Sequence, residues 1–207
     1  MRRSERAPRI KTKVGYHHGD LRRQLVLASR RLIDRHGVDA FKLADAAKLA
    51  GVSAAAPYRH FADRLALLVA VADDGFERLG LVANDAVADL EAGSVDAVCA
   101  LGLAYIGFAR ANPNVFRLMF GPEEKAGREV PEEGTGGYDV LIRQVAAHLE
   151  LPGDSPPVLG TALSLWMYVH GFASLLIDDK LGIGRLEIDI PAMVRANTAP
   201  MLHAFVP

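Results

Sequence analysis

The chain of 207 residues has only one cysteine, Cys99, which excludes an internal disulfide and a thiolate-rich metal site. A reducing compartment fits this composition. Cys99 lies in the apolar stretch VCALG and is most simply a small core residue, with a redox or ligand-sensing thiol as the alternative. Uninterrupted apolar runs of the roughly 18 residues that span a membrane are also missing. The basic start MRRSERAPRIKTK is followed by no apolar segment, so we expect neither a secretory signal nor a membrane partner.

The net charge is close to zero, at −1, but the charges are unevenly distributed along the chain. Residues 1–66 contain 15 Lys and Arg against 6 Asp and Glu, whereas residues 67–207 contain 9 against 19. A basic N-terminal part joined to an acidic remainder predicts a head that binds a polyanion. A basic face that is merely solvated is the alternative.

Motifs of the common enzyme classes do not occur. The chain has no G-x-S-x-G, no Walker loop, no Rossmann glycine pattern and no H-E-x-x-H. We therefore expect no enzyme, no cofactor and no metal site. The adjacent pair His17 and His18 is able to bind a metal, but a solvated or minor-groove arm is the favoured interpretation.

Apolar residues at helical spacing are abundant, whereas alternation with a period of two is missing. The sequence therefore predicts an all-α fold of about nine helices. Asp20, Ser53, Asp63 and Ser94 are expected to cap helices, and Pro200 to bend or break the last one. The expected helices cover residues 21–36, 43–50, 54–60, 64–90, 95–111, 113–120, 138–149, 156–178 and 190–205.

The second and third of these helices are joined by the short turn AGVS, which is typical of a helix-turn-helix motif. In such a motif the following helix lies in the DNA major groove, with its N-terminal residues at the base edges. Ala54, Ala55 and Ala56 have small side chains that allow close approach and contact with thymine methyl groups.

Polar residues around this turn are candidates for further DNA contacts. Tyr58 and His60 can bond phosphate oxygens, and Arg59 can reach a phosphate or a guanine edge. A solvated charge is the alternative for each basic residue. The predicted DNA-binding residues are Lys42, Lys48, Ser53, Ala54, Ala55, Ala56, Tyr58, Arg59, His60 and Arg64.

The stretch GDLRRQLVLASRRLIDRHGVDAFKLADAAKLAGVSAAAPYRHFADRLALLVAV resembles the DNA-binding domain of the TetR (tetracycline-repressor-like) family, over about residues 18–71. The resemblance implies an all-helical homodimer, with a three-helix head and a larger body that binds a small effector and dimerises through its last two long helices. It also implies that Tyr58 and Arg64, a Lys in most relatives, hold phosphates. Lys42 departs from the family pattern, because a Ser or Thr usually caps the helix there at a gain of about 1 kcal/mol.

The stretches YHHGDLR, AAPYRHF and WMYVHG resemble one subgroup, whose body is known as the WHG domain. Trp166 and His170 are four residues apart and share a helix face. Pocket linings are mostly apolar with a few polar groups, so large side chains of the body predict an effector pocket, with plain core packing as the alternative. The candidates are Tyr105, Phe108, Phe116, Met119, Trp166, Met167 and His170.

These observations predict a disordered basic arm (1–15), a helix-turn-helix DNA-binding domain (16–63) and a helical effector-binding and dimerisation domain (64–207). The expected function is a cytoplasmic, nucleoid-associated transcriptional regulator, a repressor released from a palindromic operator by a small molecule. One alternative is an effector-binding or scaffold protein whose head makes protein contacts. Another is an all-helical enzyme that uses the body cavity.

Overall fold

The computed structural model describes residues 18–121, 136–179, 182 and 187–203. In these ranges there are α-helices, one short 3-10 helix and no strand, which confirms the all-α prediction. The helices are α1 (His18–His36), α2 (Leu43–Leu49), α3 (Arg64–Val87), α4 (Val95–Ala111), α5 (Pro113–Phe120), α7 (Gly137–Leu149), α8 (Pro156–Ile177) and α9 (Ile190–Leu202), and the 3-10 helix η1 is Pro57–Arg59.

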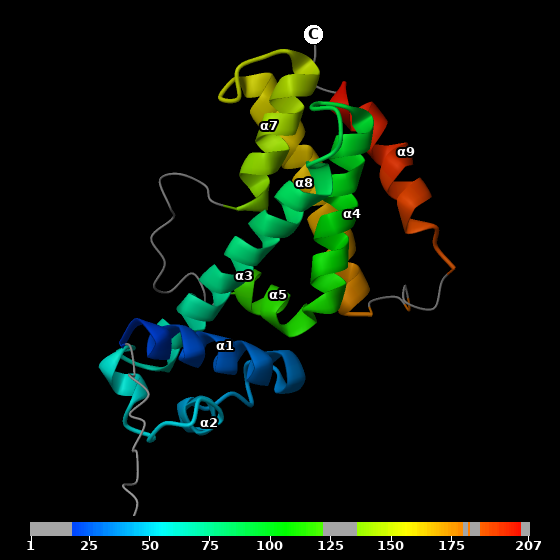
Figure 1. Cartoon of the computed structure of the whole chain (residues 1–207). Helices are drawn as coiled ribbons and strands as arrows, with labels where there is room; N and C mark the ends of the chain where they lie inside the picture. Colours follow the sequence, from blue (N-terminus) through cyan, green and yellow to red (C-terminus); the bar gives the residue numbers. More distant parts are fainter. Residues whose placement is uncertain (1–17, 122–135, 180–181, 183–186, 204–207) are drawn as a thin grey trace, which may run out of the picture.

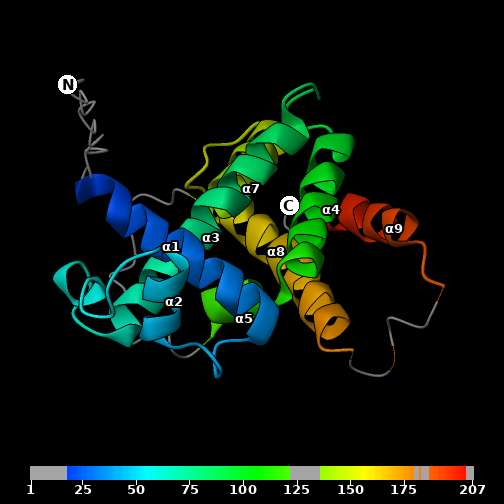
Figure 2. The same cartoon turned by 60° about the horizontal axis from the view of Figure 1, so that its bottom comes forward.

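Two parts of the molecule are visible in Figure 1. The first part, which we call the head, contains α1, α2 and η1 at the bottom of the view. The second part, the body, is the bundle of α4, α5, α7, α8 and α9 above it. Helix α3 begins in the head and rises into the body. The view in Figure 2 places α2 and the turns after it on the far side of α1 from α9.

Several helix boundaries follow local capping signals. The Asp63 carboxylate accepts a hydrogen bond from the Ala66 N–H at 2.8 Å, and the Ser94 hydroxyl accepts one from the Ala97 N–H at 3.1 Å. Both predicted caps are thereby confirmed. Lys42 precedes α2 without any side-chain capping bond, as expected from its chemistry.

Other boundaries differ from the prediction. Helix α1 begins at His18, so Asp20 lies inside the helix and is not its N-cap. Helix α9 contains Pro200 and continues to Leu202, since the proline lacks only the one N–H that would bond the Ala196 carbonyl. Helix α3 ends at Val87, three residues before the predicted end. The predicted arm, His17 and most of the predicted 121–137 loop lie outside the described residues.

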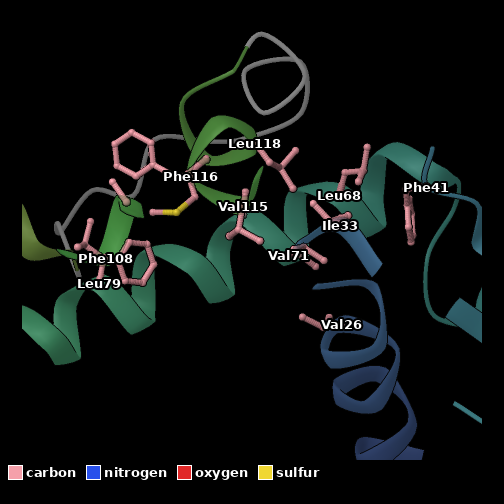
Figure 3. Packing of buried hydrophobic residues seen from close by; sticks show 14 of the residues in the cluster. Val26, Ile33, Phe41, Leu68, Val71, Leu79, Phe108, Val115, Phe116 and Leu118 are labelled. Atoms are coloured by element: carbon pink, nitrogen blue, oxygen red, sulfur yellow. The ribbon is translucent and has the colours of Figure 1, made fainter. Parts of the chain in front are cut away.

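A hydrophobic core runs without a break from the head into the body. Figure 3 shows Val26, Ile33 and Phe41 of the head near Leu68 and Val71 of α3, with side chains of α5 farther along the same helix. The predicted boundary at residues 63 and 64 therefore marks the start of a helix that both parts share. Cys99 is a free thiol buried in this core.

Among the described helices, only α8 is long and apolar enough to cross a membrane by length and composition alone. One face of this helix is buried against its neighbours α4 and α7. The buried residues of α8 are Val158, Thr161, Ala162, Leu165, Val169 and Ala173.

Candidate nucleic-acid interface and effector cavity

The turn after α2 is closed by backbone hydrogen bonds of the Schellman type. The Gly51 N–H donates to the Lys48 carbonyl at 3.1 Å, and the Val52 N–H donates to the Ala47 carbonyl at 3.0 Å. Gly51 has a φ of 72°, a conformation in which a side chain is disfavoured. This positive φ sets the direction in which the chain leaves α2.

The segment after this turn, residues 53–60, is not the α-helix that the sequence predicted. Its bonds join residues three apart: the Ala56 N–H donates to the Ser53 carbonyl at 3.0 Å, and the His60 N–H to the Pro57 carbonyl at 2.9 Å. An α-helix would need an N–H at Pro57 to bond the Ser53 carbonyl, and proline has none. Tight turns and η1 take the place of the helix, and Ser53 is not its cap.

One side of the 53–60 segment is anchored and the other is open to solvent. Pro57 and Phe61 are buried, and Ala56 is half-buried against the head core. Ala54 and Ala55 are exposed, and Tyr58 keeps 62% of its surface accessible. Ser53, Arg59, Lys42 and Lys48 are exposed too, whereas His60 is half-buried.

Arg64 begins α3 and forms hydrogen bonds to backbone carbonyls of the head. Its Nη2 donates to the Val38 carbonyl at 2.6 Å, and its Nε donates to the Phe41 carbonyl at 3.3 Å. The guanidinium carbon lies 5.9 Å from the centre of the Phe41 ring. Arg64 therefore closes the loop between α1 and α2, a role that the sequence reasoning missed because its partners are more than 20 residues away.

A second group of charges joins α1 to the body. Arg30 of α1 forms an ion pair with Asp74 of α3 at 2.7 Å, and Arg78 donates to the Asn112 side chain at 3.1 Å. Burial raises the pKa of Asp34, and the nearby guanidinium groups of Arg30 and Arg78 oppose that shift. The Arg30–Asp74 pair joins α1 to α3, and the Arg78 bond joins α3 to the turn between α4 and α5. The charge pattern along the chain did not reveal these contacts.

The body contains a cavity of about 300 Å³ between α3, α4, α5, α7, α8 and α9. Two of the predicted pocket residues, Tyr105 and Trp166, line it. The others do not: Phe108, Phe116 and Met119 are buried in the core, and Met167 is 56% exposed. The lining residues are Phe76, Leu79, Ala83, Val98, Leu101, Gly102, Tyr105, Phe120, Gly136, Gly137, Tyr138, Leu141, Leu165, Trp166, Val169 and Thr198.

His170 lies behind the cavity wall and bonds a residue that lines it. The Tyr105 hydroxyl and His170 Nδ1 are 2.8 Å apart, and Trp166 Nε1 donates to the same hydroxyl at 3.4 Å. Burial raises the pKa of Tyr105 and lowers the pKa of His170, so the phenol keeps its proton and the imidazole is neutral at neutral pH. The Tyr105 hydroxyl is therefore hydrogen-bonded to the neutral His170 ring and also accepts from Trp166.

Comparisons with known proteins place these features in a family. The model described as bacterial regulatory proteins of the tetR family matches residues 25–71, which include α2 and the 53–60 segment. The model described as the tetracyclin repressor-like C-terminal domain matches residues 98–198, which include most of the body. None of the curated proteins matches the chain.

Solved structures are similar to the chain over nearly its whole length. A protein of unknown function from Rhodococcus sp. RHA1 is 32% identical, with a TM-score of 0.73 over 93% of this chain and 98% of that one. A TetR variant from Acinetobacter baumannii AYE in complex with minocycline is 16% identical, with a TM-score of 0.62 over 92% and 97%. A TetR transcriptional regulator from Rhodococcus sp. RHA1 is 17% identical, with a TM-score of 0.60 over 90% and 98%.

Regulators of this family are DNA-binding proteins without enzymatic activity, and they are typically repressors and homodimers. The first match covers most of the head and the start of α3, and the C-terminal match covers most of the helices that line the cavity. The chain therefore belongs to the TetR family of transcriptional regulators.

Proposed function

We propose that this regulator represses transcription by binding a palindromic operator as a homodimer and dissociates when a small molecule occupies the body cavity. The observation that carries the proposal is the exposed side of the 53–60 segment on a basic head. Ala54 and Ala55 project no bulky group there, while Tyr58 and Arg59 stand exposed beside them. Such a surface suits close approach to base edges flanked by phosphates.

Most of the sequence candidates keep their proposed roles at this surface. Ala56 and Arg64 differ, because Ala56 packs on the head core and Arg64 bonds the loop before α2. We assign those two residues to positioning the surface. The proposed DNA contacts are Lys42, Lys48, Ser53, Ala54, Ala55, Tyr58, Arg59 and His60.

An apolar stripe on the outside of α8 supports the proposed homodimer. Leu159, Leu163 and Met167 are all at least 41% exposed, and their spacing of four residues places them along one face. A large exposed apolar patch is costly in water and typically marks an interface. A two-fold dimer through α8 and α9 would present two heads to half-sites about 34–36 Å apart. Met167 thus moves from the predicted pocket to the proposed dimer interface.

Helices α3 and α5 offer a route from the cavity to the head. Phe76, Leu79 and Ala83 of α3 line the cavity, and the first turns of the same helix are buried in the head core. Helix α5 contributes Phe120 to the cavity, and Asn114 of α5 donates to the Asp34 carbonyl of α1 at 3.0 Å. A ligand that prefers a shifted position of either helix would therefore change the spacing of the two heads.

The proposal is tested by selecting operators from a random duplex library with the full-length protein, then measuring affinity at several salt concentrations. We expect a palindromic site and an affinity that falls steeply with salt. Arg59→Ala should weaken specific binding by about 1–3 kcal/mol, whereas Arg110→Ala, an exposed arginine on α4, should leave it unchanged.

Two results would contradict the proposal. One is the failure of any duplex to be enriched or to bind with a salt-dependent affinity. The other is equal operator affinity of the Arg59→Ala and Arg110→Ala variants, which would favour protein contacts for the head.

A further inference from the structure

We infer that the body cavity binds an uncharged aromatic molecule of about two rings, an assignment that rests on the proposed control by an effector. The volume of about 300 Å³ sets the size. An engineered apolar cavity of about 150 Å³ accommodates one benzene, so twice that volume suits two fused or linked rings. It also lies at the lower limit of typical small-molecule sites.

The lining that the structure describes disfavours a charged occupant. No Asp, Glu, Lys, Arg or His belongs to the lining among the described residues. A carboxylate or ammonium group entering this space would lose its hydration without meeting an opposite charge. The side-chain polar atoms of the described lining are those of Tyr105, Tyr138, Trp166 and Thr198.

The wall also offers aromatic surface in several orientations. Five aromatic rings line the cavity, from α3, α4, α5, α7 and α8. The Tyr138 and Trp166 rings meet at an interplanar angle of 61°, and the Phe120 and Trp166 rings at 45°. Rings set at such angles present both faces and edges, which a flat aromatic guest can meet by stacking and by edge contacts.

One polar group of the wall, the Tyr105 hydroxyl, already has hydrogen-bond partners within the protein. The Tyr105 hydroxyl is hydrogen-bonded to His170 and accepts from Trp166, so it gains little from a polar ligand. A guest that carries many hydrogen-bonding groups would leave them unpaired in the cavity. The preferred guest is therefore mostly hydrocarbon, with at most a small uncharged polar substituent.

A matched pair of probes tests the assignment by calorimetry on the full-length protein at neutral pH. Naphthalene-2-methanol is uncharged, and 2-naphthoate carries a carboxylate on the same ring system. We expect the alcohol to bind once per chain and roughly tenfold or more tighter than the carboxylate. Trp166, the only tryptophan of the chain, should change its fluorescence on binding.

A variant with a larger side chain in the cavity lining is the structural control. Ala83→Leu puts three more carbons into the lining and should weaken alcohol binding roughly tenfold, whereas Ala88→Leu, an exposed site one residue beyond α3, should not. If circular dichroism shows that Ala83→Leu does not fold, Leu165→Phe takes its place. Absence of binding by both probes, a preference for the carboxylate, or unchanged binding in the filled variant overturns the assignment.

Operator binding distinguishes this inference from the proposed function. If the protein binds the alcohol in the cavity but still binds its operator, the assigned ligand class stands and the proposed release mechanism is wrong. If the protein binds operator but neither probe, the DNA-binding role stands and the assigned ligand class is wrong.

Discussion

Replacing Arg64 by alanine should destabilise the head because the guanidinium closes the loop between α1 and α2. The variant loses the bond to the Val38 carbonyl at 2.6 Å and the longer bond to the Phe41 carbonyl at 3.3 Å. Hydrogen bonds to charged groups contribute about 1.5–3 kcal/mol each. Arg64 is half-buried, so solvent reduces this contribution, and one bond is long. We expect a loss of about 2–3 kcal/mol, including a small cation–π term.

Native-state hydrogen exchange of the α2 amides measures this loss where it occurs. A change of about 2 kcal/mol corresponds to a roughly thirtyfold decrease in protection. Arg64→Lys retains the positive charge but lacks the planar fork that reaches both carbonyls, so its protection should be intermediate.

The opposite outcome would refute this reasoning. If Arg64 holds a DNA phosphate, as the family resemblance implies, Arg64→Ala should leave α2 protection unchanged. It would then reduce the slope of log affinity against log salt concentration by about one.

Three further predictions concern the body. Gly93→Ala should destabilise the protein by several kcal/mol, because Gly93 has a φ of 76° and a Cβ there would lie 2.6 Å from a backbone nitrogen of α7. Gly107 lies in a helix with open space around it, so Gly107→Ala should stabilise the protein by about 0.5–1 kcal/mol. Urea denaturation measures both changes. Burial lowers the pKa of His170, so its contribution to stability is complete above the unfolded value of 6.5 and is lost as pH falls through the lower folded pKa. His170→Gln should remove this component, and denaturation curves at neutral and acidic pH would show a smaller loss in the variant. Leu163→Glu should convert the proposed dimer to monomer in analytical ultracentrifugation, whereas Leu81→Glu on the exposed side of α3 should not.

Local signals in the sequence accounted for most helix boundaries. Asp63 and Ser94 cap their helices because their side-chain oxygens reach a backbone N–H three residues ahead, a contact that needs no distant partner. Gly37 and Gly51 end helices with positive φ for the same local reason. Such signals failed at Ser53, because Pro57 has no N–H for the Ser53 carbonyl and tight turns form there instead of an α-helix.

The two parts of the candidate site differ in how much a short motif can predict. The motif at residues 53–60 predicts DNA contacts by Tyr58 and Arg59, whose side chains are exposed, and those contacts stay a prediction. The pocket prediction relied on the size of side chains and selected Phe116 and Met119, which fill the core instead of lining the cavity. Residue size does not show whether a side chain meets its neighbours or leaves space between them.

The sequence by itself determined the all-α class, the helix-turn-helix and the charge difference between the two parts, because each depends on residues close together in the chain. Only the tertiary structure decided that Arg64 bonds Val38 and Phe41, and that residues of six helices enclose one uncharged cavity. Those features depend on how helices far apart in the chain pack together. Packing is a collective property of many side chains, so no short pattern encodes it.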